Sequence, residues 1–345
     1  MKREAHEILN DLCAGNHFSF DGAGEFMEQV MDGQFTPSQT GAMLCALRLK
    51  GETPDEIAGF ALAMREKAIP FPLESNVQVM DNCGTGGDKK KTFNISTSAA
   101  LLACALGLKI VKHGNRSVSS LSGSADFLEA LGIRIDLPPE NMKKLFEETG
   151  FAFLYAPLYH PAMKAVQQVR RELGIRTIFN ILGPLTNPAL VSYKMIGVYD
   201  ELLVLPLAQA LAKMGVCRGL VYWGQPGMDE ISLSGTTKMA FVEKDTVRTF
   251  DFHPEELHFA QKPWEELRGG TPQENAHLFD SLLQGTNKGT IRESMVLNTA
   301  FLAWVSDPSK NLEDIVQEVE GVIDSGKALQ KMKQLVRESQ RITSR

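Results

Sequence analysis

Two loops rich in glycine and hydroxyl side chains constrain this chain more than any other feature. The first occupies residues 81–88 and the second residues 112–120. Each loop follows a short apolar run, at residues 77–80 and 108–111, and each leads into a helical pattern. The order strand, loop, helix, strand, loop, helix predicts a βαβ unit. Because ligands of such sheets bind at the carboxyl ends of the strands, we expect both loops at one binding edge.

The side chains of the two loops suit an anionic ligand. Glycines within residues 84–87 allow the main chain to approach a ligand closely, and free N–H groups there can face an anion. The second loop adds Lys112 and Arg116 to four serines between residues 117 and 122. Cations and hydroxyls suit phosphate and sugar oxygens. We therefore interpret the pair as one polyphosphate site, the alternative being two ordinary surface turns.

The lysine at position 89 argues against two better-known glycine motifs. A dinucleotide G-x-G-x-x-G and a P-loop G-x-x-x-x-G-K-[ST] that start at Gly84 would both need glycine there. The NAD and ATP interpretations therefore lose their main support. Downstream, residues 94–97 precede the apolar stretch 99–106, so hydroxyls and free N–H groups of a helix start are expected beside the first loop.

Composition indicates a globular protein that is large enough for two domains. The chain has 345 residues, 43% of them hydrophobic, and a formal net charge of −6. The acidic balance argues against nucleic acid as the main partner. The N-terminus lacks an apolar signal region, no run approaches a membrane span, and the five cysteines form no C-x-x-C pair. We expect a cytoplasmic protein that binds neither membranes nor nucleic acid.

Residues 1–70 have a helical pattern with clear start signals. The sequences T-P-S-Q at 36–39 and T-P-D-E at 53–56 are capping boxes with proline at the first helical position. The first of these helices is expected to end at Gly51 and the second before Pro70. Residues 1–70 are therefore predicted to form a compact helical subdomain. We expect its apolar residues to face an internal core, and a contact with a partner subunit is the alternative.

The remaining chain alternates between strand and helix patterns. Helices are expected at 124–131, 139–149, 161–173, 201–214, 312–323 and 328–336, and strands at 134–137, 151–154, 192–198, 219–222, 239–242 and 246–250. In the helix 161–173, Arg170 falls inside the apolar face and Arg171 about 80° outside it. An inward-facing guanidinium needs an anionic partner. That partner is either a ligand or an acidic side chain in a structural ion pair.

Two adjacent carboxylates, Asp229 and Glu230, follow a turn-rich stretch at the end of an expected strand. Mg²⁺ prefers one or two carboxylates together with water and phosphate oxygens, so the pair is a candidate anchor for Mg²⁺. Solvated surface charges are the alternative. None of the histidines has metal-ligand spacing to another, which argues against zinc.

A longer set of motifs occurs in a fixed order along nearly the whole chain. They are G-T-G-G-D at 84–88, T-F-N-I-S-T at 92–97, K-H-G-N-R with S-S within 112–120, G-S-A-D at 123–126, L-E-A-L-G at 128–132, H-P-A-M-K at 160–164, V-R-R-E-L-G-I-R-T at 169–177, the stretch 180–188, and D-E at 229–230. This set resembles the anthranilate phosphoribosyltransferase family of tryptophan biosynthesis.

The resemblance implies transfer of the 5-phosphoribosyl group from 5-phospho-α-D-ribose 1-diphosphate (phosphoribosyl diphosphate) to anthranilate, with release of diphosphate and a requirement for Mg²⁺. It implies an α/β fold in which a small N-terminal helical domain is hinged to a larger domain with a central, mostly parallel sheet flanked by helices. The helical domain would comprise residues 1–70 and about 163–188, and the α/β domain residues 71–162 and about 189–345. A homodimer through the helical domain is also implied.

The resemblance also implies roles for individual residues. Phosphoribosyl diphosphate would be held by Gly84, Gly87, Asp88, Thr92, Asn94, Ile95, Ser96, Thr97, Lys112, His113, Gly114, Asn115, Arg116, Ser117, Val118, Ser119, Ser120 and Ser124. Mg²⁺ would be held by Ser96, Asp229 and Glu230. Anthranilate would meet Gly84, Asn115 and Arg170, with His113 and His160 nearby. The mechanism would be electrostatic, supported by Lys112 and Arg170, with no certain general base.

The chain departs from the family's pattern at Lys89-Lys90-Lys91, at Gln167-Gln168 and at Trp223. None of these residues is assigned to chemistry. Two other classes share the implied fold: pyrimidine nucleoside phosphorylases, and nucleic-acid-binding relatives without enzymatic activity. The tandem loops favour the transferase over the phosphorylase, and the acidic net charge disfavours the nucleic-acid-binding class.

Overall fold

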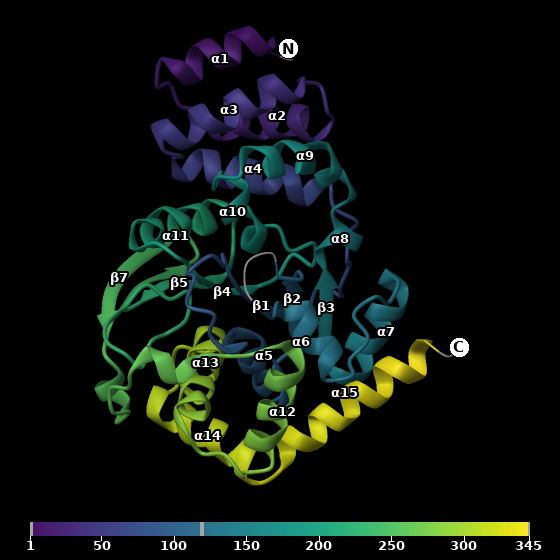
Figure 1. Ribbon diagram of the computed structural model, residues 1–345, viewed down its shortest axis with the longest axis vertical. Helices are drawn as coiled ribbons and strands as arrows, with labels where there is room; N and C mark the ends of the chain where they lie inside the picture. The colour runs from purple at the N-terminus through teal and green to yellow at the C-terminus, as the bar shows by residue number, and fades with distance from the viewer. Residues whose placement is uncertain (1–2, 118–120, 344–345) are drawn as a thin grey trace.

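The computed structural model describes residues 3–117 and 121–343, which form a helical layer above an α/β layer (Figure 1). The first four helices of the helical layer are α1 (Ala5–Cys13), α2 (Phe20–Met31), α3 (Pro37–Lys50) and α4 (Pro54–Glu66). Two later helices, α9 (Lys164–Leu173) and α10 (Phe179–Leu182), return to lie between these four and the sheet (Figure 1).

The helix starts in this layer follow the expected capping chemistry. Thr36 and Thr53 each accept a hydrogen bond from the main chain three residues on, and Gln39 and Glu56 accept in return. Helix α3 ends before Gly51, whose φ of +79° requires glycine. The apolar residues of α3 and α4 are buried in a core shared with α2 and α9, so the default expectation of an internal core is confirmed.

The α/β layer contains one seven-stranded sheet with the order β3-β2-β1-β4-β5-β6-β7. Its strands are β1 (Met80–Gly84), β2 (Ile110–Gly114), β3 (Phe151–Tyr155), β4 (Tyr193–Gly197), β5 (Arg218–Gly224), β6 (Thr237–Glu243) and β7 (Thr246–Phe252). The first five pair in parallel, and β6 and β7 are antiparallel. Strands β1 and β2 are parallel neighbours joined by α5 (Ile95–Ala105), which confirms the predicted βαβ unit.

Helices cover both faces of this sheet. The lower and outer helices in Figure 1 are α6 (Ser124–Ala130), α7 (Pro139–Thr149), α12 (Pro272–Leu283), α13 (Thr290–Ser306), α14 (Leu312–Asp324) and α15 (Lys327–Thr343), with α11 (Val204–Lys213) on the opposite side. The short helix α8 (Ala156–Tyr159) follows β3 and lies between it and α9 in this view. Met80 and Ile110 face the core around α5 and α13, whereas Val79 and Val111 face the other side. This period-2 alternation leaves the strand ends free to carry polar groups.

Several sequence-based boundaries are wrong. The expected strands 77–80 and 108–111 are shifted, because polar residues such as Asp81 and Lys112 belong to the strands, where they are buried and hydrogen-bonded. Residues 134–137 form no strand: the main chain of Arg134 binds the Ser339 hydroxyl of α15 instead of a neighbouring strand. Helices α12 and α13 were not predicted.

None of the described helices is long and apolar enough to cross a membrane. The five cysteines were expected to be reduced and buried; all are free, but only Cys104 is buried, and Cys13 and Cys217 are exposed, so the expectation of burial is wrong. Burial raises the pKa of the Cys83 thiol to about 11, so this side chain next to the glycine loop stays protonated at neutral pH.

Candidate active site

Three neighbouring strands, β1, β4 and β5, end in the glycines Gly84, Gly197 and Gly224. A Cβ atom on Gly84 would lie 2.2 Å from Asp229 Oδ2, and one on Gly197 would lie 1.8 Å from the Asp229 carbonyl oxygen. A Cβ atom on Gly224 would lie 2.3 Å from the Glu230 carbonyl oxygen. The loop that carries both carboxylates therefore rests directly on the main chain of three strands, and side chains at the strand ends would displace it.

The predicted metal residues lie together at this edge. Asp229 Oδ2 accepts a hydrogen bond of 2.9 Å from the Gly86 N–H of the glycine loop. Glu230, which is only 6% exposed, accepts one of 3.1 Å through Oε1 from the Ser96 N–H at the start of α5. The acidic pair, the glycine loop and the helix start thus form one cluster.

Burial and mutual repulsion disfavour the ionised forms of the carboxylates in this cluster. Burial, and then the charge of Asp88, raises the pKa of Asp229 to about 7. Burial, and then Asp229, raises the pKa of Glu230 well above its ordinary value. In the described residues, Asp88 Oδ2 and Glu230 Oε2 are buried without a hydrogen-bond partner. Such oxygens are costly unless a cation or donor reaches them.

This donor set fits Mg²⁺, which prefers hard carboxylate oxygens. Across residues 3–117 and 121–343, no group of three His, Cys, Asp or Glu side chains is arranged to hold a metal ion alone. A bound Mg²⁺ would therefore need water and phosphate oxygens to complete its shell, as Mg²⁺ commonly does in phosphate sites.

Lys112 lies below this cluster, on β2. Its side chain is 2% exposed, and its ammonium group donates to the main-chain and side-chain oxygens of Asn82. The Asn82 amide donates in turn to the Ser96 carbonyl at 2.7 Å. The positive charge of Lys112 acts against the pKa rise of Glu230. Its contact with a phosphate stays a prediction, because its ammonium group is bound to β1.

The chain just after the second loop is hydrogen-bonded to Asn94, the residue that precedes α5. Asn94 Nδ2 donates to the Ser122 carbonyl at 3.1 Å, and Asn94 Oδ1 accepts from the Ser122 hydroxyl at 2.9 Å. Arg116 is paired with Asp126 and Glu129, each at 2.8 Å. The positive charge expected from Arg116 is therefore already offset by two carboxylates. The predicted residues Val118, Ser119 and Ser120 lie outside the described residues.

The other predicted phosphate-site residues lie around these two loops. Near the first loop, Ile95 and Thr97 are buried in the first turn of α5, and Thr92 pairs with Arg268 in an isolated bridge. Near the second loop, Gly114 ends β2, and the Ser124 hydroxyl donates to the Asn115 carbonyl. The main-chain N–H of Ser117 donates to Asp126. The two loops therefore meet at one edge of the sheet, as the βαβ pattern predicted.

Two buried histidines, His113 and His160, face each other with ring centres 4.9 Å apart. The main-chain N–H of His113 donates to Asp81 Oδ1, and the ring Nδ1 of His113 lies 3.2 Å from the Gly183 carbonyl oxygen, in the connection between the layers. Burial lowers the pKa of His113 to about 4, and burial with the neighbouring His113 lowers that of His160 to about 3. Both rings are therefore uncharged at neutral pH.

Arg170 points inward and Arg171 outward, as the helical phase predicted. Arg170 is half-buried, with its guanidinium carbon 5.3 Å from the centre of the Phe179 ring, and Arg171 is exposed. Burial lowers the pKa of Arg170. No ion pair found between described residues includes Arg170. The structural ion pair considered as an alternative is therefore not supported.

Sequence reasoning missed Arg176, which follows α9. Its Nη2 donates to the Gly87 carbonyl of the glycine loop, and its guanidinium carbon lies 3.8 Å from the centre of the Tyr199 ring. The only sequence signal was its place within the motif at 169–177, because its partners lie far away along the chain.

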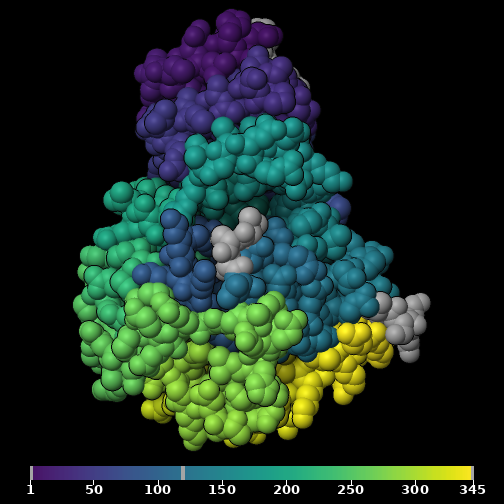
Figure 2. Space-filling model, viewed as in Figure 1, coloured from purple at the N-terminus to yellow at the C-terminus, as the bar shows by residue number. Residues whose placement is uncertain are grey.

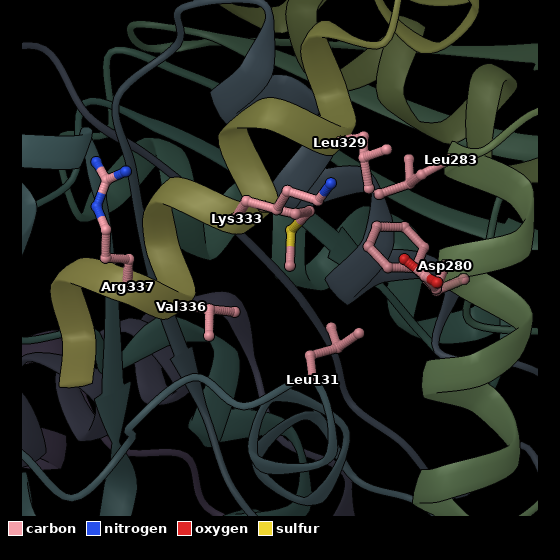
Figure 3. A pocket seen from close by; sticks show the side chains of 9 residues that line it. Leu131, Asp280, Leu283, Leu329, Lys333, Val336 and Arg337 are labelled. Carbon is pink, nitrogen blue, oxygen red and sulfur yellow. The ribbon is translucent and has the colours of Figure 1, made fainter.

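The space-filling view shows a hollow between the layer that contains α9 and the loops that follow β1 and β2 (Figure 2). A second cavity, of about 310 Å³, lies between α12 and α15 at the end of the α/β layer away from the helical layer (Figures 1 and 3). Apolar side chains face one another across it, and its charged residues Asp280, Lys333 and Arg337 are exposed. None of these three charged side chains has a buried polar atom without a hydrogen-bond partner, in contrast to Asp88 and Glu230.

Comparison with known proteins places both layers in one class of enzyme. Residues 6–68 match the helical bundle domain of a glycosyl transferase family, and residues 76–329 match the α/β domain of the same family. The two domains are those of a glycosyl transferase family.

Individual relatives narrow this class. The chain is 44% identical to the anthranilate phosphoribosyltransferase of Petrotoga mobilis, over 95% of each chain. The crystal structure of the Thermus thermophilus enzyme of that name superposes with a TM-score of 0.90 at 40% identity, covering 96% of this chain and 99% of the other. The Saccharomyces cerevisiae enzyme, solved in complex with PRPP (phosphoribosyl diphosphate) and Mg, has a TM-score of 0.89 at 27% identity over 98% of each chain. The chain belongs to the anthranilate phosphoribosyltransferase family.

Proposed function

We propose that this protein transfers the 5-phosphoribosyl group of phosphoribosyl diphosphate to the amine of anthranilate, giving N-(5-phosphoribosyl)anthranilate and diphosphate in tryptophan biosynthesis. The observation that carries the proposal is the arrangement of opposite charges around one hollow. Asp88, in the loop after β1, and Glu230, in the loop after β5, each have one buried oxygen without a hydrogen-bond partner among the described residues. Arg170, which takes part in none of the ion pairs found between described residues, comes from α9, and the layer of α9 and the loop after β1 border the hollow (Figure 2).

On the sheet side, the two loops would hold phosphoribosyl diphosphate. Ser96, Asp229 and Glu230 would hold Mg²⁺, because they lie together and because the buried oxygen of Glu230 lacks a donor. Bound Mg²⁺ supplies positive charge that stabilises the departing diphosphate. The loop main chain and the buried ammonium of Lys112 add fixed positive potential at the same edge.

On the helical side, Arg170 would bind the carboxylate of anthranilate through two parallel hydrogen bonds. His113 and His160 are uncharged at neutral pH, so they would flank the ring without competing for its carboxylate. The bond from the ribose carbon to diphosphate breaks, the anthranilate nitrogen forms the new bond, and its proton leaves to solvent. Placement and electrostatic stabilisation carry this reaction, and we assign no general base.

Three further expectations remain proposals. We propose that residues 1–70 and 163–188 act as the helical domain and residues 71–162 and 189–345 as the α/β domain. We also propose a homodimer through the helical layer; the exposure of Leu49 on α3, 87%, supports an apolar contact there. Light scattering of the purified protein tests the dimer. The cytoplasmic location stays a prediction.

The transferase activity is tested by the loss of anthranilate fluorescence in the presence of phosphoribosyl diphosphate and Mg²⁺. We expect turnover that stops when Mg²⁺ is chelated. Phosphate-dependent cleavage of pyrimidine nucleosides, or salt-dependent DNA binding without transfer, would instead indicate one of the alternative classes.

A further inference from the structure

A series of contacts leads from the glycine loop to the helical layer through Arg176. Its side chain donates to the Gly87 carbonyl in the α/β layer and lies over the ring of Tyr199, after β4. Its own carbonyl oxygen accepts a hydrogen bond of 2.6 Å from Nη1 of Arg48, on α3. One residue of the connection between the layers therefore contacts both of them.

Gly87 is suited to this contact in two ways. Its φ of +83° is accessible to glycine and strained for other residues. A Cβ atom on Gly87 would lie 3.0 Å from Arg176 Nη2 and 3.4 Å from its guanidinium carbon. The same glycine that shapes the phosphate loop therefore also makes room for the guanidinium.

Arg176 and Arg170 belong to one short, well-defined segment. The Gly174 N–H donates to the Arg170 carbonyl at 3.3 Å and ends α9, and Arg176 follows two residues later. Like Arg170, Arg176 takes part in none of the ion pairs found between described residues; a main-chain carbonyl and an aromatic ring surround its charge instead. Only the end of α9 and its cap at Gly174 separate the two arginines along the chain.

We propose that Arg176 couples the two substrate sites. An anion bound at the glycine loop fixes Gly87, Gly87 fixes Arg176, and Arg176 holds the end of α9 so that Arg170 is in place for the carboxylate of anthranilate. Arg176 is then a positioning residue that acts through Arg170, and the inference rests on the proposed function. By linkage, anthranilate tightens the binding of the anion by the same factor.

Calorimetry of anthranilate binding tests this coupling. The titration is done without and with Mg²⁺-diphosphate, which occupies the phosphate side and allows no transfer. For the wild-type protein we expect Mg²⁺-diphosphate to tighten anthranilate on the order of tenfold. In Arg176→Gln this factor falls to about one, whereas the affinity for anthranilate alone changes by less than about threefold. The matched control is Arg171→Gln, which alters an exposed arginine of the same segment and keeps the full factor.

Two results would overturn the inference. One is a full coupling factor in folded Arg176→Gln protein; the other is equal weakening of both ligands with the factor retained, which indicates a merely structural role. If Arg176→Gln does not fold, Arg48→Ala and Arg176→Lys replace it. Each should lower the factor, because the first removes the contact with α3 and the second removes the planar group that lies on Tyr199; an unchanged factor in both overturns the proposal.

The same titrations separate this inference from the proposed function. A wild-type protein that forms no phosphoribosylanthranilate contradicts the function itself. A wild-type protein that forms the product, but whose affinity for anthranilate is unaffected by Mg²⁺-diphosphate, contradicts the coupling alone.

Discussion

Glu56 in the helical layer and Glu230 at the strand ends are both buried glutamates, but their surroundings differ. Both oxygens of Glu56 lie 2.7 Å from the Lys50 ammonium, and the Thr53 N–H also donates to this carboxylate. Glu230 accepts one hydrogen bond, from Ser96, and its second oxygen has no hydrogen-bond partner within the described residues. One carboxylate is fully satisfied by the protein, and the other is not.

The pKa values follow this difference. Burial alone would raise the pKa of Glu56, but the hydrogen bonds from Lys50 and from the main chain outweigh burial and lower it below 4.5. For Glu230 burial dominates, and the pKa rises well above its ordinary value. Ionised Glu56 therefore stabilises the fold, whereas ionisation of Glu230 costs free energy in the protein alone. Each prediction below tests this contrast.

The largest effect on stability is expected at Glu56. Glu56→Gln leaves the Lys50 ammonium, whose side chain is 5% exposed, without its carboxylate, and should lower the free energy of unfolding by about 3–5 kcal/mol. Because the folded pKa is lowered, the contribution of Glu56 is present above pH 4.5 and is lost as the pH falls through the folded value. Urea unfolding measures the loss, with the exposed Glu66→Gln on the same helix as control.

The acidic pair should show the opposite pattern. Asp229→Asn combined with Glu230→Gln removes buried negative charge, so the melting temperature in EDTA should stay the same or rise. Transfer at limiting Mg²⁺ should fall by about 100-fold or more, because neutral amides cannot offset the charge of the cation. Activity as a function of Mg²⁺ concentration is the measurement, and an unchanged Mg²⁺ dependence would remove these residues from the metal site.

Arg170 extends the contrast to a cation without an acidic partner. Truncating one member of a buried charge pair costs on the order of 2–5 kcal/mol, so Arg170→Ala should weaken anthranilate by at least about 30-fold. Arg171→Ala should have much less effect, since its side chain is exposed. Both Michaelis constants and the melting temperature are measured for the two variants. A destabilised Arg170→Ala protein with normal anthranilate affinity would show a structural role instead.

The smallest effect is a pH dependence that arises from Asp229. Its folded pKa of about 7 lies above the ordinary 3.8, so its ionisation destabilises the Mg²⁺-free fold progressively as the pH rises from about 4 to about 7. Mg²⁺ needs the ionised form, and its apparent affinity should therefore fall by up to about tenfold per pH unit below pH 7. Titrations with Mg²⁺ at several pH values test this, and Asp229→Asn should flatten the profile.

Helix starts could be predicted from the sequence because their signals are local. A threonine, a proline and an acidic or amide side chain within four residues define each capping box, and the structure forms both as expected. The strand ends could not be placed in this way. Lys112 and His113 have the polarity of a loop, and only partners about 30 residues away, at Asn82 and Asp81, make them suitable for a buried strand.

The same limit applies to the site. The inward phase of Arg170 was readable from its own helix, and the structure agrees. Two other features depend on packing between distant segments. One is that Arg170 has no acidic partner within the described residues, and the other is the contact between Arg176 and Gly87. Family motifs named most of the residues around the two loops, but neither motifs nor periodicity indicated that Arg116 is already paired with Asp126 and Glu129.

The acidic loop rests on the strand ends through contacts between distant parts of the chain. The Gly86 N–H and its carboxylate partner Asp229 are 143 residues apart, and Ser96 and Glu230 are 134 residues apart. The glycine loop leaves the ribosome long before β5 exists, so neither Asp229 nor Glu230 is available to it while the N-terminal half begins to fold. Because contacts between distant parts of a chain form late, we expect the short-range contacts within the first four helices to form first.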